Sequence, residues 1–427
     1  MNVQIRLRPI AAALLALGLA PGLASATDGY FANGYGVRSN GMAGTSLALA
    51  PDAMGGANNP ASMAFVGQRL DLGVNWFNPQ RSVERFNAAP GLNGSVDSDK
   101  TSFWIPEFGV NTMIRPDVAL GLTVYGNGGM NTDYPGGQLN CGFGPGTANM
   151  LCGSGNLGVD LSQLIIAPTL AWQFSPGQSL GFAPLFGYQR FKAYGLQAFT
   201  MLSSSPQNVT NNGYDDSTGW GLRLGYQGVF GAFRVGAVYT TKMSMSNFDK
   251  YKGLFAEQGG FDMPENFGVG VAFDPAPAWT LAADWLRINY SGVSSVGNSS
   301  RNMAPLGFDN GPGFGWRDVN VFRIGAEWRM DPAWTLRAGY NYTQNPVTPE
   351  NVTFNILAPG VVQNHLSLGF TWNYSSTMAL SGQYTYAFDN SVEGPSLFNM
   401  LIGPGAGGTE RISMHQNILG VAWSMKF

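Results

Sequence analysis

An alternation of apolar and polar residues with a period of two runs through most of the chain and constrains its fold more than any other feature. The first run alternates Leu70, Leu72, Val74 and Trp76 with Asp71, Gly73 and Asn75. Similar runs follow within 220–227, 267–273, 322–328, 366–372 and 419–427. Side chains of a strand point alternately to its two faces, so this pattern predicts strands with one apolar and one polar face.

The composition indicates what each face meets. Charged residues are 11% of the 427-residue chain, against about 25% in soluble domains. Mean hydropathy is −0.04, and no segment offers the roughly 18 consecutive apolar residues of a spanning helix. We therefore predict an all-β transmembrane barrel that presents apolar side chains to lipid and polar side chains to its lumen.

Residues 1–26 have the parts of a secretory signal peptide. Arg6 and Arg8 precede an apolar stretch at 10–19, and Ala24-Ser25-Ala26 is an A-x-A cleavage site. Cleavage there would make Thr27 the first mature residue. A signal peptide in front of a barrel pattern predicts a barrel in the bacterial outer membrane. The chain has 23 basic and 26 acidic residues, which excludes the basic surface of a nucleic-acid-binding protein.

Short and long connections alternate after residue 68. Short turns are centred near 116, 176, 231, 275, 332 and 376, and long connections cover 81–102, 131–158, 194–214, 246–262, 292–316, 346–360 and 392–411. They predict a 14-stranded antiparallel barrel over 68–427, with short periplasmic turns and seven extracellular loops. The last strand ends at Phe427, a terminal aromatic residue of the kind that bacterial barrels present to their assembly machinery.

The region before the first strand lacks the alternation. The stretch 34–64 is rich in glycine and alanine and has no pattern of a long helix or strand. Small residues let one backbone approach another closely, and a barrel of about 14 strands has a lumen that must be filled if it is to be sealed. We predict that 27–67 fold into the lumen as a plug, with Asn59-Pro60-Ala61 leading the chain into the wall.

Three segments carry a resemblance to a known family. They are Asp52-Ala53 with Asn58-Asn59-Pro60-Ala61-Ser62, the stretch 125–134 (YGNGGMNTDY), and the stretch 262–268 (DMPENFG). They resemble the plug end, the end of the third strand and the start of the eighth strand of the FadL-like outer-membrane transporters of long-chain fatty acids and aromatic hydrocarbons. Met263 stands where that family has Leu.

The resemblance implies passive uptake of hydrophobic molecules by a monomer without a cofactor. A ligand would be caught between extracellular loops, enter a lumenal pocket and leave sideways into outer-membrane lipid, which avoids the polar lipopolysaccharide. Tyr30 and Phe31 would line the pocket, and Gly126, Gly128 and Gly129 would form the kink that opens the wall. Glycine marks bulges in strands, and the alternative for these three glycines is an ordinary loop start. The alternative for Tyr30 and Phe31 is a frayed N-terminus.

Two long loops carry apolar side chains suited to a capture groove. They are Leu196 and Phe199 in 194–214, and Phe248, Tyr251, Leu254 and Phe255 in 246–262. Exposed apolar side chains are costly unless they pair with something. The alternative is that the two loops pack on each other and cap the barrel.

Four charged residues face the lumen by parity on three consecutive predicted strands: Asp284, Arg323, Glu327 and Arg337. We expect them to pair with one another. The alternative is that Arg323 or Arg337 stays free to bind a substrate carboxylate, which would favour fatty acids over plain hydrocarbons.

The remaining chemistry is sparse. Cys141 and Cys152 lie in one loop of an exported protein and predict a disulfide. His365 and His415 are the only histidines, and neither has a neighbouring nucleophile or acid that indicates catalysis or a metal site. A nonspecific porin or a structural, adhesin-like barrel is the other class to weigh, and the sequence leaves fatty acid, alkane and aromatic ligands open.

Overall fold

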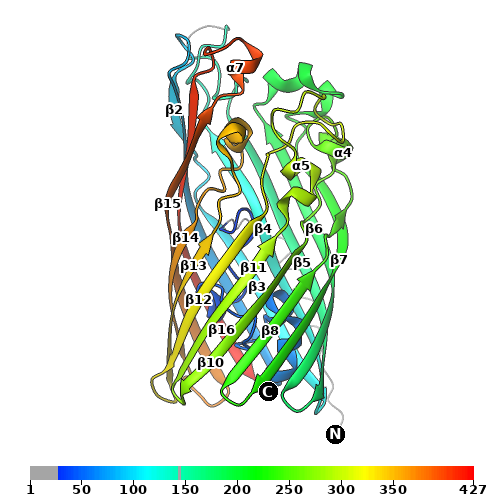
Figure 1. The fold of residues 1–427 in the computed structure, drawn as a ribbon, viewed down its shortest axis with the longest axis vertical. Coiled ribbons are helices and arrows are strands. Elements are labelled where there is room, and N and C mark those ends of the chain that lie inside the picture. Colours follow the sequence, from blue (N-terminus) through cyan, green and yellow to red (C-terminus); the bar gives the residue numbers. More distant parts are fainter. Residues whose placement is uncertain (1–26, 143–145) are drawn as a thin grey trace.

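The computed structural model describes residues 27–142 and 146–427, so the predicted signal peptide lies outside the described residues. Strands tilted around one axis form a closed barrel, with irregular loops gathered at one end (Figure 1). The described residues contain sixteen strands, of which β2 (Gly94–Asp97) is short and pairs with β1, and β9 (Ser244–Met245) is short and pairs with β7. The other fourteen make the wall, which confirms the predicted 14-stranded antiparallel barrel.

The wall strands, in chain order, are β1 (Arg69–Phe86), β3 (Phe103–Arg115), β4 (Val118–Tyr134), β5 (Leu157–Ser175), β6 (Gln178–Tyr194), β7 (Asp215–Phe230), β8 (Phe233–Thr240), β10 (Asn266–Ala276), β11 (Trp279–Ile288), β12 (Val319–Arg329), β13 (Trp334–Thr343), β14 (Asn364–Trp372), β15 (Met378–Pro395) and β16 (Thr409–Lys426). Each wall strand pairs antiparallel with its neighbours, and β1 closes the barrel on β16 from Arg69↔Lys426 to Phe86↔Thr409. Closure pairs the first and last strands of the sheet, as a sheet that spans lipid requires.

The alternation predicted from the sequence sets the two faces of the wall. On β14, for example, Leu366 and Leu368 are exposed on the outside, whereas His365 and Ser367 are buried on the inside. Near the short turns, tryptophans stack in pairs on the outer face: Trp279 on Trp328 at 5.6 Å, and Trp334 on Trp372 at 5.9 Å. No helix in the described part of the chain is both long and apolar enough to cross a membrane.

Several strands run further toward the end with the long loops than the sequence indicated. β1 continues to Phe86, and β15 continues to Pro395, so the connections predicted at 81–102 and 392–411 are shorter than expected. Both extensions pair with β16, because the period-two pattern persists there. The loops hold only short helices: η2 (Gln197–Leu202), η3 (Pro206–Asn208), η4 (Asp249–Tyr251), α4 (Ala256–Gly259), η5 (Tyr290–Gly292), α5 (Ser294–Gly297), η6 (Pro349–Asn351), α6 (Val352–Asn355) and α7 (Phe398–Leu401).

The segment before β1 lies within the lower half of the barrel, where Figure 1 shows it as blue coils. It contains α2 (Val37–Asn40), α3 (Gly55–Asn58) and η1 (Pro60–Phe65), joined by irregular backbone. Most of its side chains are buried. We call residues 27–67 the inner segment.

Candidate functional site

The inner segment is held by carboxylates that the wall directs into the lumen. Glu107 on β3 accepts hydrogen bonds from the backbone N–H groups of Gly36, at 3.2 Å, and Val37, at 2.9 Å. Both N–H groups belong to the start of α2, where a short helix has no intrahelical acceptor for them. A buried N–H without a partner is costly, so Glu107 stabilises this turn inside the barrel.

Two further carboxylates act in the same way. Asp284 on β11 accepts the N–H groups of Ser46, at 2.7 Å, and Leu47, at 3.0 Å. Asp71 on β1 accepts the N–H of Ala53 at 2.8 Å. The sequence placed these acids in the lumen but did not reveal their role. The feature of the sequence that could have revealed this role is the irregular, glycine-rich segment, whose own side chains offer few hydrogen-bond acceptors.

The motif Asn59-Pro60-Ala61 ties the end of the inner segment to the wall. The Asn59 side chain donates to the backbone oxygens of Leu47, at 2.7 Å, and Tyr226, at 2.9 Å, and accepts the N–H of Ala61 at 3.1 Å. The wall comes so close that a Cβ added to Gly181 would lie 2.2 Å from the Ala61 nitrogen. A glycine is therefore needed on β6 where the motif touches it.

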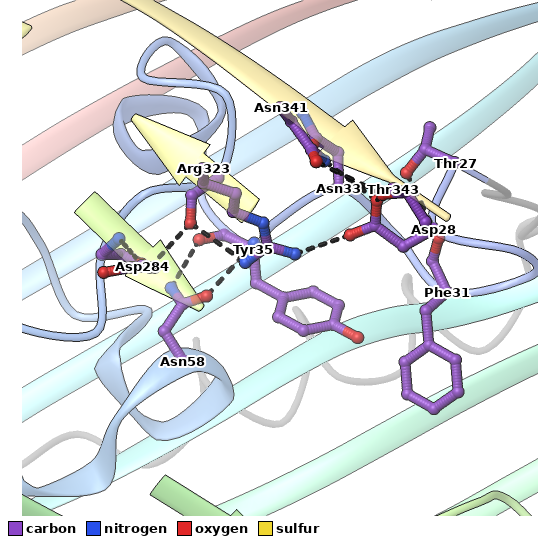
Figure 2. Close-up of polar contacts among 12 residues, drawn as sticks. Thr27, Asp28, Phe31, Asn33, Tyr35, Asn58, Asp284, Arg323, Asn341 and Thr343 are labelled. Atoms are coloured by element: carbon purple, nitrogen blue, oxygen red, sulfur yellow. Dashed lines mark hydrogen bonds and ion pairs between the residues drawn. The ribbon is translucent and has the colours of Figure 1, made fainter. Parts of the chain in front are cut away.

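The first described residues are anchored on the opposite strands. Asp28 is fully buried, and its carboxylate accepts from Arg323 Nη2 on β12 at 2.6 Å and from Asn341 Nδ2 on β13 at 2.9 Å. The Thr343 hydroxyl donates to the same carboxylate. Figure 2 shows the Arg323 guanidinium directed at Asp28, with Asn341 and Thr343 beside the same group.

The predicted network of four lumenal charges forms only in part. Glu327 Oε2 and Arg337 Nη2 pair at 2.8 Å, and Arg337 also donates to Thr371 at 2.7 Å. The prediction is wrong for Asp284 and Arg323, although the two are opposite each other in the β11–β12 register. Both side chains bond the inner segment instead: Asp284 accepts two of its backbone N–H groups, and Arg323 pairs with its Asp28 carboxylate.

A break in strand pairing lies between β3 and β4. The β3–β4 ladder ends at Phe108↔Val124, while β4 continues to Tyr134 and stays paired to β5 on its other side. The β4–β5 register shifts between Gly126 and Gly128, which makes Asn127 the extra residue of a bulge. The upper part of β4 thus has no continuous strand partner on its β3 side.

The inner segment covers this break. The N–H of Ala32 donates to the Asn127 oxygen, and the N–H of Gly129 donates to the Tyr30 oxygen, both at 3.2 Å. Phe31 and Gly128 form an isolated antiparallel bridge. A Cβ at Gly128 would lie 1.8 Å from the Tyr30 oxygen, so glycine is required for the two backbones to meet.

Tyr30 and Phe31 are packed rather than frayed. The Tyr30 ring lies 5.2 Å from Tyr290 and 5.7 Å from Trp316, and the Phe31 ring lies 6.0 Å from Tyr290. Phe261 extends the group, since its ring lies 6.1 Å from Tyr30 and 4.9 Å from Phe255. Rings in contact therefore run from the inner segment into the long loops.

Phe255 also lines an apolar pocket among those loops. Its walls are Leu151, Val159, Phe191, Leu196, Phe199, Leu254, Phe255, Ser295, Leu306, Pro312, Gly313, Phe314, Phe354 and Leu357. Ser295 is the one hydroxyl-bearing residue of that wall, and its side chain donates to the Gly260 oxygen at 2.5 Å. The wall offers a ligand apolar surface and no charge.

The predicted capture residues divide between this wall and the layer behind it. Leu196, Phe199, Leu254 and Phe255 line the pocket. Phe248 and Tyr251 are buried behind it, with their rings 5.6 Å and 4.8 Å from Phe191. Sequence reasoning missed the wall residues from 292–316 and 346–360, among them Leu306, Phe314 and Phe354.

One wall residue of the pocket, Leu151, precedes a disulfide. The sulfur atoms of Cys141 and Cys152 are bonded in the structure. Cys152 packs against the large apolar cluster that contains Leu151. The bridge therefore ties the loop after β4 to the side of the pocket.

Residues 20–396 match the family described as "Outer membrane protein transport protein (OMPP1/FadL/TodX)". No curated protein gives a significant match.

Solved structures share the fold. The P. putida toluene transporter TodX (18% identity, TM-score 0.68) is matched over 92% of this chain and 99% of its own. A Pseudomonas aeruginosa FadL homologue (15%, 0.68) is matched over 93% and 100%, and the Ralstonia pickettii toluene transporter TbuX (17%, 0.62) over 92% and 99%. The chain therefore belongs to the OMPP1/FadL/TodX family of transport proteins and is a β-barrel of the outer membrane.

Proposed function

We propose that the protein conducts hydrophobic molecules passively across the outer membrane and releases them sideways into lipid. The candidates are long-chain fatty acids and aromatic hydrocarbons, which are the ligand classes of the family it resembles. The molecule enters the apolar pocket among the extracellular loops, moves along the rings toward Tyr30 and Phe31, and leaves through the wall beside the β4 bulge. Burial of apolar surface, at about 25 cal/mol per Å², supplies the affinity.

The observation that carries this proposal is the covered break beside β4. A hydrophobic molecule gains nothing from a polar channel, but it gains from an exit that opens directly into the hydrocarbon layer. The upper part of β4 meets Tyr30–Ala32 there instead of a continuous β3 strand. Displacement of three residues of the inner segment is a much smaller change than separation of two fully paired strands.

The test is a cross-link across the covered break. Bridged residues on antiparallel backbones have Cα atoms about 4.5–5.5 Å apart, within the range of a disulfide. Ala32 and Asn127 are the next pair along these two backbones and are joined by a hydrogen bond of 3.2 Å. The double variant Ala32→Cys, Asn127→Cys should bond these positions and hold the inner segment against β4. Uptake of a radiolabelled hydrophobic solute by cells should fall at least tenfold and should recover with a reductant.

Each single-cysteine variant is the control, because it carries the same change in side chain without the link. Wild type with reductant controls for loss of the native bridge between Cys141 and Cys152. Full uptake by the oxidised double variant, with the bond verified by mass spectrometry, would refute an exit at this place.

A nonspecific porin, or a structural, adhesin-like barrel, is the alternative. A porin would pass sugars briskly in a liposome-swelling assay, and a structural barrel would pass neither sugars nor hydrophobic solutes. The inner segment is bonded to Glu107, Asp284 and Asp71 inside the lumen, which argues against an open porin. The apolar pocket argues against a purely structural barrel.

We further propose that the protein acts as a monomer and reaches the membrane through its last strand. Closure of β1 on β16 leaves neither the first nor the last strand with an unpaired edge for a second copy. Phe427 ends the chain beside β16 and is 58% exposed, so the barrel-assembly machinery can reach it. Truncation of Phe427 should reduce insertion in the outer membrane, measured by heat-modifiable mobility.

A further inference from the structure

A polar cavity of about 230 Å³ lies at the end of the barrel that carries the short turns. Its wall comes chiefly from α2, the start of β1, the end of β16 and the turn between β14 and β15. Three wall residues are cationic, namely Arg38, Arg69 and Lys426, and none of the described residues in the wall is acidic. Cations and hydroxyl groups without a carboxylate make up the donor set that proteins use for oxyanions.

Two of the cations lie side by side at the seam that closes the barrel. Arg69 on β1 and Lys426 on β16 are partners in the strand register. Both belong to the inward-facing set of their strands, since Asp71 and Ser424, two positions away, are buried in the lumen. Arg69 pairs with Asp71 at 2.6 Å, whereas no carboxylate of the described residues forms an ion pair with Lys426.

The third cation, Arg38, comes from α2 of the inner segment and donates to neutral acceptors. They are the Ser381 hydroxyl at 3.2 Å, the Pro51 backbone oxygen at 3.0 Å and the Ser424 hydroxyl at 3.4 Å. Within the described chain, no carboxylate reaches ion-pair distance of this guanidinium. A buried or partly buried charge without a counter-charge is costly, so the site would gain from an anion.

The charges nearby do not remove this excess. Burial and the positive charge of Arg69 lower the pKa of Arg38 to about 9, and Asp71 and Asp52 offset the effect only in part. Arg38 therefore stays charged at neutral pH in surroundings that compensate it poorly. Arg38 and Lys426 together leave two positive charges without an ion pair, which matches the charge of a dianion.

The turn between β14 and β15 supplies neutral donors on another side of the cavity. Ser375, Ser376 and Thr377 line the cavity and are exposed. The Ser375 hydroxyl accepts the N–H groups of Thr377, at 3.3 Å, and Met378, at 2.9 Å, and it can still donate its own hydrogen. Donors on several sides suit the tetrahedral oxygens of a phosphate better than the planar pair of a carboxylate.

We propose that this cavity is a binding site for a soluble phosphate dianion, held between Arg38 of the inner segment and Lys426 and the β14–β15 turn of the wall. A phosphate monoester carries about −1.5 to −2 charges at pH 7. The source is aqueous, because Arg69 and Lys426 face the lumen while the alternate positions Leu70 and Met425 face lipid. The predicted topology places this end in the periplasm, and the site is independent of hydrophobic transport.

The experiment is isothermal titration of inorganic phosphate into the full-length purified protein, in an uncharged detergent at neutral pH and physiological ionic strength. Exposed charges are largely screened under these conditions, so a built site should stand out. Wild type should bind phosphate at least tenfold more tightly than acetate. Arg38→Gln and Lys426→Gln should each weaken phosphate binding about tenfold, as expected for the loss of a charge-assisted bond.

Two further variants keep the test sharp. Arg115→Gln is the matched control, because Arg115 also lies near a short turn but is 66% exposed and pairs with Asp117 outside the cavity. It should change phosphate affinity less than twofold. Thr377→Val removes one exposed hydroxyl of the turn and should weaken phosphate binding several-fold, so it serves as the test if the cation variants do not fold.

A lipid probe separates the two sources of a phosphate group. Dihexanoylphosphatidic acid should bind no more tightly than inorganic phosphate. Tighter binding that is lost in Arg38→Gln would overturn the soluble source and assign the cavity to lipid headgroups.

Three other results would refute the site itself. They are no phosphate binding by wild type, affinities unchanged in both Arg38→Gln and Lys426→Gln, and a loss in Arg115→Gln as large as theirs. Hydrophobic uptake is measured separately, so failure of the phosphate site leaves the proposed transport standing.

Discussion

The two halves of the lumen are filled by opposite chemistry. In the lower half, an irregular backbone is held by directional hydrogen bonds, chiefly from five backbone N–H groups to the carboxylates of Glu107, Asp284 and Asp71. In the upper half, the loops meet through apolar and aromatic side chains around an apolar pocket. Both halves are buried inside the same wall.

The difference follows from what each half contributes to the core. The inner segment is rich in small residues, so it fills space mainly with backbone, and buried backbone groups require partners. The loops contribute large side chains, whose contacts are nondirectional and roughly proportional to area. The lower half therefore holds one fixed arrangement, whereas the upper half can accommodate ligands of different shape.

Deletion of residues 34–58 is the strongest way to break this comparison. It removes the backbone that fills the lower lumen and leaves the wall strands and the loops intact. We expect a stable barrel that passes ions and sugars, measured by planar-bilayer conductance and liposome swelling. Deletion protein that folds and stays sealed to small ions would show that the inner segment is not the seal.

A charge placed in the upper half should have the next largest effect. Leu254 lines the apolar pocket and is only partly buried, so Leu254→Asp should fold. It places a carboxylate among side chains that offer it no partner, which is costly, and it should lower hydrophobic-solute uptake by cells at least tenfold.

Met201→Asp is the matched control for that variant. Met201 lies in the loop 194–214 and is 87% exposed, so the same substitution there meets water. Uptake close to wild type is expected. Equal losses in both variants would mean that the loop surface, rather than the pocket, captures the ligand.

A single anchor of the lower half should have a smaller effect. Glu107→Ala leaves the N–H groups of Gly36 and Val37 without their acceptor. Each such loss costs about 1–3 kcal/mol, which is not enough to expel a segment held at several points. We expect brief conductance openings in single-channel recordings of an otherwise closed barrel.

Glu393→Ala is the control for the loss of a glutamate, because the Glu393 side chain is 48% exposed in its ion pair with Arg411. Single-channel recordings of Glu393→Ala should match those of wild type. If Glu107→Ala also stays silent, the carboxylates of the wall are not individually important for closure.

The pH should have the smallest effect, a slight change in the stability of the anchored inner segment. Burial, with repulsion from Asp71, raises the pKa of the Asp52 carboxyl to about 6, above the usual value of about 4. Because the pKa is higher in the anchored state, ionised Asp52 destabilises that state above pH 6. The penalty is lost as the pH falls from 6 toward 4. Arg38, Arg69, Asp71 and Glu107 are the charged groups that act on it.

The measurement is the frequency of openings in the Glu107→Ala background at pH 7.5 and pH 5. Fewer openings are expected at pH 5. Adding Asp52→Asn should shrink the difference between the two pH values. An unchanged pH dependence would assign it to another group.

Much of the wall was predictable because its signal is local. The alternation on β14 places Leu366 outside and His365 inside from the backbone period alone, and each short turn falls at a break in that period. Strand ends were less predictable. β1 and β15 extend beyond the predicted boundaries, because β16 continues to pair with both of them.

The pocket was half predictable for the same reason. Leu254 and Phe255 stood out as apolar residues in a long loop, and both line it. Leu306 and Phe354 come from other loops, and nothing in a single sequence indicates which loops meet. Phe248, from the predicted set, packs behind the wall, because only the three-dimensional path of its loop decides which face it shows.

The covered break beside β4 separates what is local from what is not. The glycines 126, 128 and 129 indicated an irregular strand, and a register shift lies among them. That Tyr30–Ala32 cover this irregularity depends on how the inner segment crosses the lumen.

Alternation along the chain was enough to define a lipid-facing barrel, its strand number and the side chains that point inward, because side-chain direction in a strand depends only on the local backbone. The partners of the inward charges were decided by the folded structure. Arg323 lies opposite Asp284 in the wall register, yet it pairs with Asp28, 295 residues away in sequence. Such a choice depends on which groups meet in a space with little water, where every buried charge and every N–H must find a partner.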